Sequence, residues 1–232
     1  MEGILEIRLK RDELHAKLGG GIPKNSLVLI EGPDGAGKSI LAQRLTYGLL
    51  EKGYTVTYIS TELNTQGFIE QMNSLTYYIT NRLINDKLLF VPMFPFFGNT
   101  ELEENFMERL FEERKIFEKE IIIFDTLSYL IVHDNITNKR TFNVMQLLKK
   151  LNSLDKTIIF CADPEHLNER FLTMLRATSD IYFDLEIKMV LGNLLRIINV
   201  KRYKRSIEEV QPAIPFKVMP KVGLAIELAS LS

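Results

Sequence analysis

The sequence has little of two features that define whole classes of protein, namely cysteine and net charge. Cys161 is the only cysteine, which excludes an internal disulfide and a zinc site built from several thiolates, and is typical of a reducing compartment. Twenty-nine basic side chains against thirty acidic ones leave a formal charge of −1. The chain therefore has no global positive field for nucleic acid or anionic lipid, although a local basic patch is compatible with this balance.

Long apolar runs are also missing. A helix that spans a bilayer needs about 18 or more consecutive apolar residues, and the longest runs here, such as residues 127–132, have the length of a strand. Residues 1–6 show neither the basic region nor the apolar region of a secretion signal. We therefore expect a cytoplasmic protein with no direct membrane insertion.

The composition is that of a folded globular chain, with 46% hydrophobic and 25% charged residues among 232. Apolar segments of strand length alternate with segments of helical period, which predicts an α/β fold whose mostly parallel central sheet has helices on both faces. Strands are predicted at residues 26–31, 55–60, 88–91, 120–125 and 157–162. No repeat, low-complexity segment or flexible linker divides the sequence, so we predict one domain over residues 1–232.

Helices are predicted between these strands from apolar spacing and end signals. The first carries Leu41, Leu45 and Leu49 on one face, and the last begins at Asp163 and Pro164. The remaining inward-facing positions are Leu102, Phe106 and Leu110 after a capping box of Thr100 and Glu103; Val144, Leu147, Leu148 and Leu151; and Leu167, Phe171, Met174 and Leu175. Beyond residue 180, antiparallel strands of the same sheet are predicted at residues 181–187, 194–203, 214–218 and 224–228.

Residues 32–39 read G-P-D-G-A-G-K-S and fit the phosphate-binding pattern G-x-x-x-x-G-K-[ST] between a strand and a helix. Glycines let the backbone curl so that its N–H groups face phosphate oxygens, and the helix start adds a positive dipole end. Lys38 is expected to reach the β- and γ-phosphates. The alternative is an ordinary glycine-rich turn. The predicted nucleotide-binding residues are Gly32, Asp34, Gly35, Ala36, Gly37, Lys38, Ser39, Ile40 and Asp125.

A phosphate-binding loop of this kind needs an acidic residue at the end of another strand. Residues 121–125 read I-I-I-F-D, so Asp125 is the candidate, and Ser39 and Asp125 together are predicted to hold Mg²⁺. Many buried strands end at an aspartate, so this run is informative only beside the loop. The next residue is Thr126 and not the glutamate that many ATPases place there.

Glu62 is therefore the candidate catalytic carboxylate. It follows the predicted strand 55–60, and in sheets of this class ligands lie beyond the carboxyl ends of the strands. From there Glu62 is expected to orient a water molecule toward the γ-phosphate. The alternative is a solvated glutamate in the first turn of the next helix, which the helix dipole favours.

Several segments resemble a known family. Residues 12–14 (D-E-L), 18–23 (L-G-G-G-I-P) and 26–32, together with P-F-K-V at 215–218 and Gly223, are similar to the KaiC-like branch of the RecA superfamily. The L-V-L-I-E-G run, T-E-L at 61–63 and the presence of one copy of the domain are most similar to the archaellum accessory ATPase homologues. The resemblance covers nearly the whole chain.

This resemblance implies a RecA-like P-loop core that binds ATP and Mg²⁺ and assembles as a homo-oligomeric ring. It also implies a place at the cytoplasmic base of the archaeal flagellum, peripheral to the membrane-embedded motor, with the archaellum motor ATPase and motor scaffold proteins as partners. Such homologues resemble nucleotide-responsive regulators with weak or no hydrolysis. Thr61 stands where relatives with a double glutamate have the first of the pair, which leaves one carboxylate in this chain.

A basic segment at residues 201–205 follows the strand 194–200. In KaiC-like rings a K-x-R element in this region reaches a neighbouring subunit's γ-phosphate, so the resemblance implies such a trans contact. The spacing here is altered, so the contact would be made either by Lys201 with Arg202 or by Lys204 with Arg205. The alternatives are a solvated edge strand and a small nucleic-acid patch.

The remaining candidate residues have no assigned function. The apolar residues 93–97 either dock a partner or fold back into the core. Cys161 is expected to be a small core residue, and His133 and His166 show no metal-ligand pattern. The rival functions are a RecA/RadA-like DNA-dependent ATPase and a circadian-type signalling ATPase or kinase. The first predicts a DNA-binding appendage or a basic stripe, of which the composition offers only five residues, and the second predicts a tandem domain, of which this sequence shows one copy.

Overall fold

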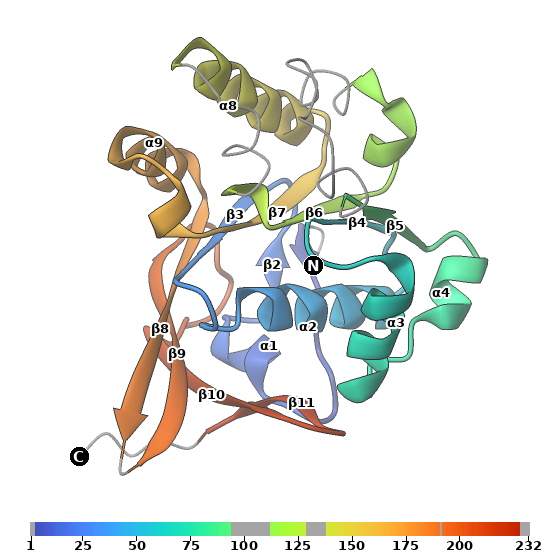
Figure 1. Ribbon diagram of the computed structural model, residues 1–232, viewed down its shortest axis with the longest axis vertical. Helices are drawn as coiled ribbons and strands as arrows, with labels where there is room; N and C mark the ends of the chain where they lie inside the picture. Colours follow the sequence, from blue (N-terminus) through green and yellow to red (C-terminus); the bar gives the residue numbers. More distant parts are fainter. Residues whose placement is uncertain (1–2, 94–111, 129–137, 191, 228–232) are drawn as a thin grey trace.

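The computed structural model describes residues 3–93, 112–128, 138–190 and 192–227, in which one nine-stranded sheet forms the centre (Figure 1). The strand order is β11-β10-β9-β8-β3-β7-β6-β4-β5. The strands are β3 (Leu27–Glu31), β4 (Val56–Ser60), β5 (Leu88–Pro92), β6 (Ile121–Asp125), β7 (Thr157–Ala162), β8 (Ile181–Val190), β9 (Asn193–Tyr203), β10 (Ala213–Met219) and β11 (Gly223–Ile226). A separate pair, β1 (Ile4–Leu5) and β2 (Ile22–Pro23), is antiparallel.

The sheet is parallel from β8 to β5, and antiparallel pairing joins β8, β9, β10 and β11. Every residue of β3, β4, β6 and β7 is buried, as expected for parallel strands covered on both faces. The mostly parallel α/β sheet is confirmed. One detail was wrong: β8 is parallel to β3, because helix α9 (Glu169–Thr178) carries the chain back across the sheet before β8 begins.

Helices cover both faces of the sheet, with α8 and α9 on one side and α1, α2 and α3 on the other (Figure 1). Besides α9, the helices are α1 (Leu14–Lys17), α2 (Lys38–Glu51), α3 (Thr65–Ser74), α4 (Thr80–Ile84) and α8 (Asn138–Ser153), with short 3-10 turns η1 (Arg114–Phe117) and η2 (Pro164–His166). Leu41, Leu45 and Leu49 of α2 are fully buried in the first core cluster. Val144, Leu148 and Leu151 of α8 are buried in the second cluster. The predicted apolar faces of these two helices are confirmed at these positions.

The predicted start of the last helix was wrong. The Asp163 side chain caps only the short turn η2, and α9 begins at Glu169. Asn168 supplies a second cap, since its side chain accepts the Phe171 N–H at 2.9 Å. Leu167 between them is extended, which separates the two segments. The inward-facing side of α9 is nevertheless as predicted, with Phe171 buried in the second cluster.

Some predictions fall outside the described residues. These are the capping box at Thr100 and Glu103 with its apolar stripe, residues 94–97 and His133. Met93, the first residue of the apolar segment, is 2% exposed and belongs to the second core cluster, which supports the core interpretation at that one position. None of the described helices combines the length and the hydropathy that crossing a bilayer requires.

The topology brings four strand ends together. From β3 the chain passes through α2 to β4, which lies three strands farther along the sheet, beyond β7 and β6. In such a crossover the carboxyl ends of the parallel strands share one edge, and ligands bind there. The register places Glu31 opposite Ala162 and Ser60 opposite Asp125. The loop at residues 32–37 therefore opens beside the ends of β7, β6 and β4.

Candidate functional site

The loop at residues 32–37 has a backbone that only glycine accommodates at its key positions. Gly35 and Gly37 have positive φ angles of 72° and 94°, and Gly37 is the N-cap residue of α2. A Cβ on Gly32 would lie 2.8 Å from the carbonyl oxygen of Leu185. This loop and the start of α2 leave backbone N–H groups without intrahelical acceptors, which is a site suited to anions.

Lys38 is folded back onto the loop. Its ammonium donates hydrogen bonds to the carbonyl oxygens of Gly32 at 2.7 Å and Pro33 at 2.9 Å. It also forms an ion pair with Asp163 Oδ2 at 3.2 Å. The Lys38 side chain is 9% exposed, so its charge is held close to the loop where a phosphate would bind.

The predicted metal pair is brought together. Ser39 Oγ donates a 2.9 Å hydrogen bond to Asp125 Oδ1, across 86 positions of sequence. The second carboxylate oxygen, Oδ2, accepts a 2.6 Å hydrogen bond from the Tyr58 hydroxyl. Burial raises the pKa of Asp125, and the hydrogen bonds from Tyr58 and Ser39 counteract that rise. The hydrogen bonds therefore support the charged form of a carboxylate that burial disfavours.

These oxygens fit a magnesium ion that is shared with phosphates. Mg²⁺ is usually bound by one or two carboxylates together with waters and substrate phosphates, and not by a cage made only of protein groups. The Ser39 hydroxyl and the Asp125 carboxylate are such a partial donor set. Among the described residues there is no group of three or more His, Cys, Asp or Glu that would hold a metal alone.

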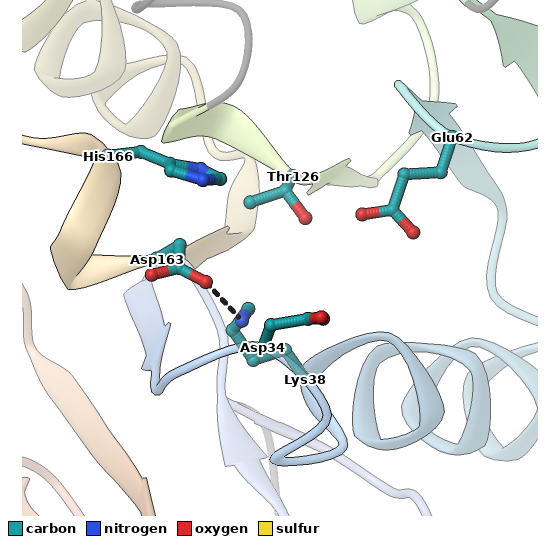
Figure 2. Close-up of a pocket in the computed structure, with 6 residues that line it drawn as sticks. All are labelled: Asp34, Lys38, Glu62, Thr126, Asp163 and His166. Carbon is teal, nitrogen blue, oxygen red and sulfur yellow. Dashed lines mark hydrogen bonds and ion pairs between the residues drawn. The ribbon is translucent and has the colours of Figure 1, made fainter.

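Glu62 lies just beyond β4, on the side of the hollow that faces Lys38 (Figure 2). Desolvation, and then the negative charge of Asp125, raise the pKa of Glu62. The neighbouring residue Thr61 bonds to the end of β6. The Thr61 N–H donates to the Asp125 carbonyl at 2.8 Å, and Thr61 Oγ1 accepts the Thr126 N–H at 3.1 Å. The two threonines thus join β4 to β6, and neither supplies a carboxylate.

Two hollows meet at the loop and share Asp34, Lys38 and Glu62. One, of about 380 Å³, is lined in addition by Thr126, Asp163 and His166 (Figure 2). The other, of about 360 Å³, is lined by Asp34, Gly35, Gly37, Lys38, Ser39, Ile40, Glu62, Gln71, Arg196 and Val218. Most of the predicted nucleotide-binding residues therefore line this second hollow, while Gly32, Ala36 and Asp125 are buried and line neither hollow.

In the basic segment at residues 201–205, Arg202 pairs with Tyr182 of β8, and Tyr182 is opposite Leu29 in the middle of β3. Lys201 contacts Asp184 at 3.3 Å, and Lys204 contacts Asp180 at 3.1 Å. Asp184 is opposite Glu31, the last residue of β3, so within one chain β8 lies between Lys201 and the strand that leads into the loop.

The two arginines of that segment donate hydrogen bonds mainly to backbone carbonyl oxygens. Arg202 donates to the carbonyl oxygens of Arg176 and Ser179 at the end of α9, the latter at 3.0 Å. Arg205 donates to the carbonyl oxygens of Lys24 and Asn25 and to Ser26 Oγ, each at 3.0 Å. Both guanidinium groups thus have intramolecular partners.

Besides Thr126, His166, Gln71 and Val218, which line the hollows, three residues near the loop were not predicted as site residues. They are Tyr58, Asp163 and Arg196, whose Nε donates to the Gly35 carbonyl oxygen at 2.9 Å. Asp163 follows β7 as Asp125 ends β6, so the shared sheet edge was a signal that could have identified it. Tyr58 and Arg196 gave no comparable signal. Cys161 is fully buried in β7, as expected, and burial raises the pKa of its thiol.

The chain matches the family described as "ATPase: KaiC" over residues 11–227. It is 39% identical to the archaeal flagellar ATP-binding protein FlaH of Methanocaldococcus jannaschii, over 99% of this chain and 100% of the relative. It is 36% identical to the protein of the same name from Methanococcus voltae, over 98% of each.

A solved structure agrees with these matches. The flagellar accessory protein FlaH from Methanocaldococcus jannaschii has a TM-score of 0.91 to this chain at 38% identity, with 97% of this chain and 100% of that chain covered. The resemblance to the KaiC-like branch and the RecA-like α/β fold are thereby confirmed. The chain belongs to the KaiC-type ATPase family and, within it, to the FlaH family of archaeal flagellar proteins.

Proposed function

We propose that this protein is an ATP-binding regulatory component of the archaeal flagellum (archaellum) motor and assembly complex. Nucleotide binding would control its assembly and its contacts with partners, with weak or no hydrolysis. The observation that carries this proposal is the 2.9 Å hydrogen bond from Ser39 to Asp125 beside the glycine loop. It places a hydroxyl and a carboxylate next to the one buried lysine of the loop.

The loop residues would bind the polyphosphate. The N–H groups at the start of α2 would donate to phosphate oxygens, and Lys38 would supply the positive charge. The base and ribose would occupy the hollow lined by Ile40, Arg196 and Val218, which is the less acidic of the two. Arg196 would also keep the loop in shape through its bond to Gly35.

Magnesium would be held by Ser39 and Asp125, whose hydroxyl and carboxylate oxygens form a partial donor set that phosphates and water would complete. When bound, the ion would neutralise part of the charge on the phosphate oxygens. Tyr58 would fix the orientation of the Asp125 carboxylate by occupying its Oδ2 atom, which leaves Oδ1 to face Ser39 and the ion.

Weak hydrolysis is proposed because the water-activating machinery is reduced to one carboxylate. Glu62 lies within the hollow next to Lys38, where it would orient a water molecule if hydrolysis occurs. Thr61 and Thr126 occupy the neighbouring positions, and their polar groups are used to join the two strands. A single, half-solvated base supports slow turnover and a regulatory use of the nucleotide.

Ring assembly would bring the basic segment of one subunit to the nucleotide of the next. Lys201 and Lys204 form only exposed ion pairs, with lysine side chains that are 49% and 52% exposed. Such pairs are worth about 0–1 kcal/mol, so a phosphate from a neighbouring chain can replace them at little cost. Arg202 and Arg205 would then serve mainly to hold the segment in place through their backbone contacts.

The cellular role is proposed from the relatives, which are named archaeal flagellar ATP-binding proteins. By analogy, this chain would act at the cytoplasmic side of the archaellum, peripheral to the membrane-embedded motor. Its partners would be the archaellum motor ATPase and motor scaffold proteins. We further propose that residues 1–232 act as one domain, since a single sheet joins both core clusters.

The alternative is a RecA/RadA-like DNA-dependent ATPase. Its main support, the basic segment at residues 201–205, is weakened by the acidic and backbone partners that these side chains have within the chain. A DNA titration at several salt concentrations separates the two functions, because phosphate contacts produce a steep salt dependence. We expect this chain to show no DNA binding with a steep dependence on salt concentration.

The proposed regulation is tested by sedimentation and by pull-down of the motor ATPase, each with ATP, ADP or no nucleotide. A ligand shifts such equilibria only through different affinity for the two forms. We expect larger assemblies and stronger partner capture with ATP. Identical assembly and identical capture under all three conditions would contradict a regulatory role.

A further inference from the structure

The Lys38 ammonium has no spare donor in this structure. An ammonium group has three N–H donors, and the acceptors are the carbonyl oxygens of Gly32 and Pro33 and the carboxylate of Asp163. Two of these acceptors belong to the loop itself. Asp163 is the only charged one, and it comes from a different strand end, 125 positions away.

Asp163 is fixed in place by its own contacts. Its Oδ1 atom accepts the Glu165 N–H at 3.0 Å, and its backbone N–H donates to Ser128 Oγ at 3.0 Å. Only Oδ2 is directed at Lys38, as Figure 2 shows. The Asp163 side chain is 7% exposed, so its charge is poorly screened by water. Oδ1 of Asp163 therefore caps the turn, and Oδ2 interacts electrostatically with the Lys38 ammonium.

The position of Asp163 differs from that of the other loop contacts. It lines the hollow that Thr126 and His166 also line, and it is absent from the hollow that Ser39 and Arg196 line. Lysines of this kind contact the β- and γ-phosphates, and the water-activating carboxylate lies beyond the γ-phosphate. Because Asp163 is paired with this lysine, its carboxylate would lie closer to the terminal phosphate of a triphosphate than to that of a diphosphate.

We propose that Asp163 is a specificity-determining residue, the counter-ion that a terminal phosphate must displace from Lys38. It lowers the preference for a triphosphate over a diphosphate, since the carboxylate would face the added negative charge at close range. The inference rests on the proposed nucleotide binding and extends it: this chain would bind ATP and ADP with more similar affinities than the loop alone would give. A regulator that responds to the ATP-to-ADP ratio needs such a balance.

The test compares Asp163→Asn with wild type in calorimetric titrations with Mg²⁺ and either AMP-PNP or ADP. Asparagine keeps an oxygen for the Glu165 N–H and removes the negative charge from the atom facing Lys38. The matched control is Glu165→Gln, which makes the same change of charge at an exposed side chain nearby. A charged hydrogen bond corresponds to about a tenfold or larger effect. We therefore expect the AMP-PNP-to-ADP affinity ratio of Asp163→Asn to rise at least about fivefold.

The ratio separates this role from a structural one, because a distorted loop would weaken both nucleotides together. An unchanged or lower ratio in Asp163→Asn would overturn the inference while leaving nucleotide binding intact. Failure of wild type to bind either nucleotide would instead overturn the proposed function. If Asp163→Asn does not fold, Asp163→Ser is used, since a serine hydroxyl can also cap the turn without a charge. The same rise in ratio is expected of it, and an unchanged ratio overturns the inference.

Discussion

The Tyr58 hydroxyl donates a 2.6 Å hydrogen bond to Asp125 Oδ2 inside the sheet, between neighbouring strands β4 and β6. Tyr58 is fully buried, and burial raises the pKa of its hydroxyl well above the ordinary value, so it stays a proton donor. The opposite oxygen of the same carboxylate accepts the Ser39 hydroxyl. A buried phenol thus decides which Asp125 oxygen faces the proposed magnesium site.

Replacing Tyr58 with phenylalanine tests this relationship. Asp125 loses one of its donors, and we expect the free energy of unfolding to fall by about 1–3 kcal/mol. We also expect the gain in ATP affinity caused by Mg²⁺ to shrink several-fold, measured by titration with and without the ion. The control is Tyr203→Phe, which removes a hydroxyl bonded to the Gly21 carbonyl oxygen, away from the site. If both variants keep the full Mg²⁺ effect, Tyr58 does not orient Asp125.

Glu62→Gln tests the proposed water-activating residue. A positioned base accelerates such steps substantially, so we expect any phosphate release by wild type to fall at least about tenfold in the variant. ATP affinity should change little, since the proposed role is toward water. The matched control is Glu70→Gln, an exposed glutamate on α3. Equal phosphate release by wild type and Glu62→Gln would remove Glu62 from any catalytic role.

The proposed trans contact predicts a defect in assembly and not in folding. In the double variant Lys201→Ala and Lys204→Ala, ATP-dependent assembly should be lost in sedimentation. Unfolding of the nucleotide-free protein should change by less than about 1 kcal/mol, because only exposed ion pairs are removed. Lys149→Ala with Lys150→Ala, on the exposed side of α8, is the control. Unaltered assembly of the Lys201 and Lys204 variant would assign these residues to the edge strand alone.

His15 predicts a pH dependence of stability. It is 6% exposed, and its Nδ1 atom accepts the Ile7 N–H at 3.4 Å, which requires the neutral ring. Burial, and then the positive charge of Arg8, lower the pKa of His15 in the folded state. Its contribution is therefore present above the unfolded pKa of about 6.5 and is lost as the pH falls through the lower folded value.

The measurement is thermal unfolding of wild type and His15→Asn between about pH 7.5 and about pH 5. Asparagine offers an oxygen to the same N–H and does not titrate. We expect wild type to lose more stability than His15→Asn as the pH falls, while all other groups titrate equally in both. Parallel pH profiles would show that His15 contributes no such dependence.

The features that were predicted correctly are those that depend on residues adjacent in the sequence. The loop at 32–39 and the strand ending at Asp125 each need particular residue types in a row, so a pattern identifies them. Strand β7 was predicted with its observed bounds because it is apolar on both faces. Helix α4 was missed for the opposite reason: it has five residues and none of them is buried, so it has no apolar face that a pattern could identify.

The rest of the site depends on contacts that no local pattern records. Tyr58 and Asp125 are 67 positions apart, and Lys38 and Asp163 are 125 positions apart. Asp163 was interpreted as a helix cap, and it does cap a turn, but its second oxygen has another partner. The parallel direction of β8 was also missed, because it depends on the path of α9 and not on the composition of the strand.

The central claim is that the loop at residues 32–39 binds a nucleoside triphosphate together with magnesium. Calorimetry with MgATP on wild type, Lys38→Ala and Ser39→Ala tests it most directly. We expect one site per chain in wild type, no detectable binding for Lys38→Ala, and binding by Ser39→Ala that no longer improves with Mg²⁺. The absence of heat with wild type, or equal binding by wild type and Lys38→Ala, would contradict it.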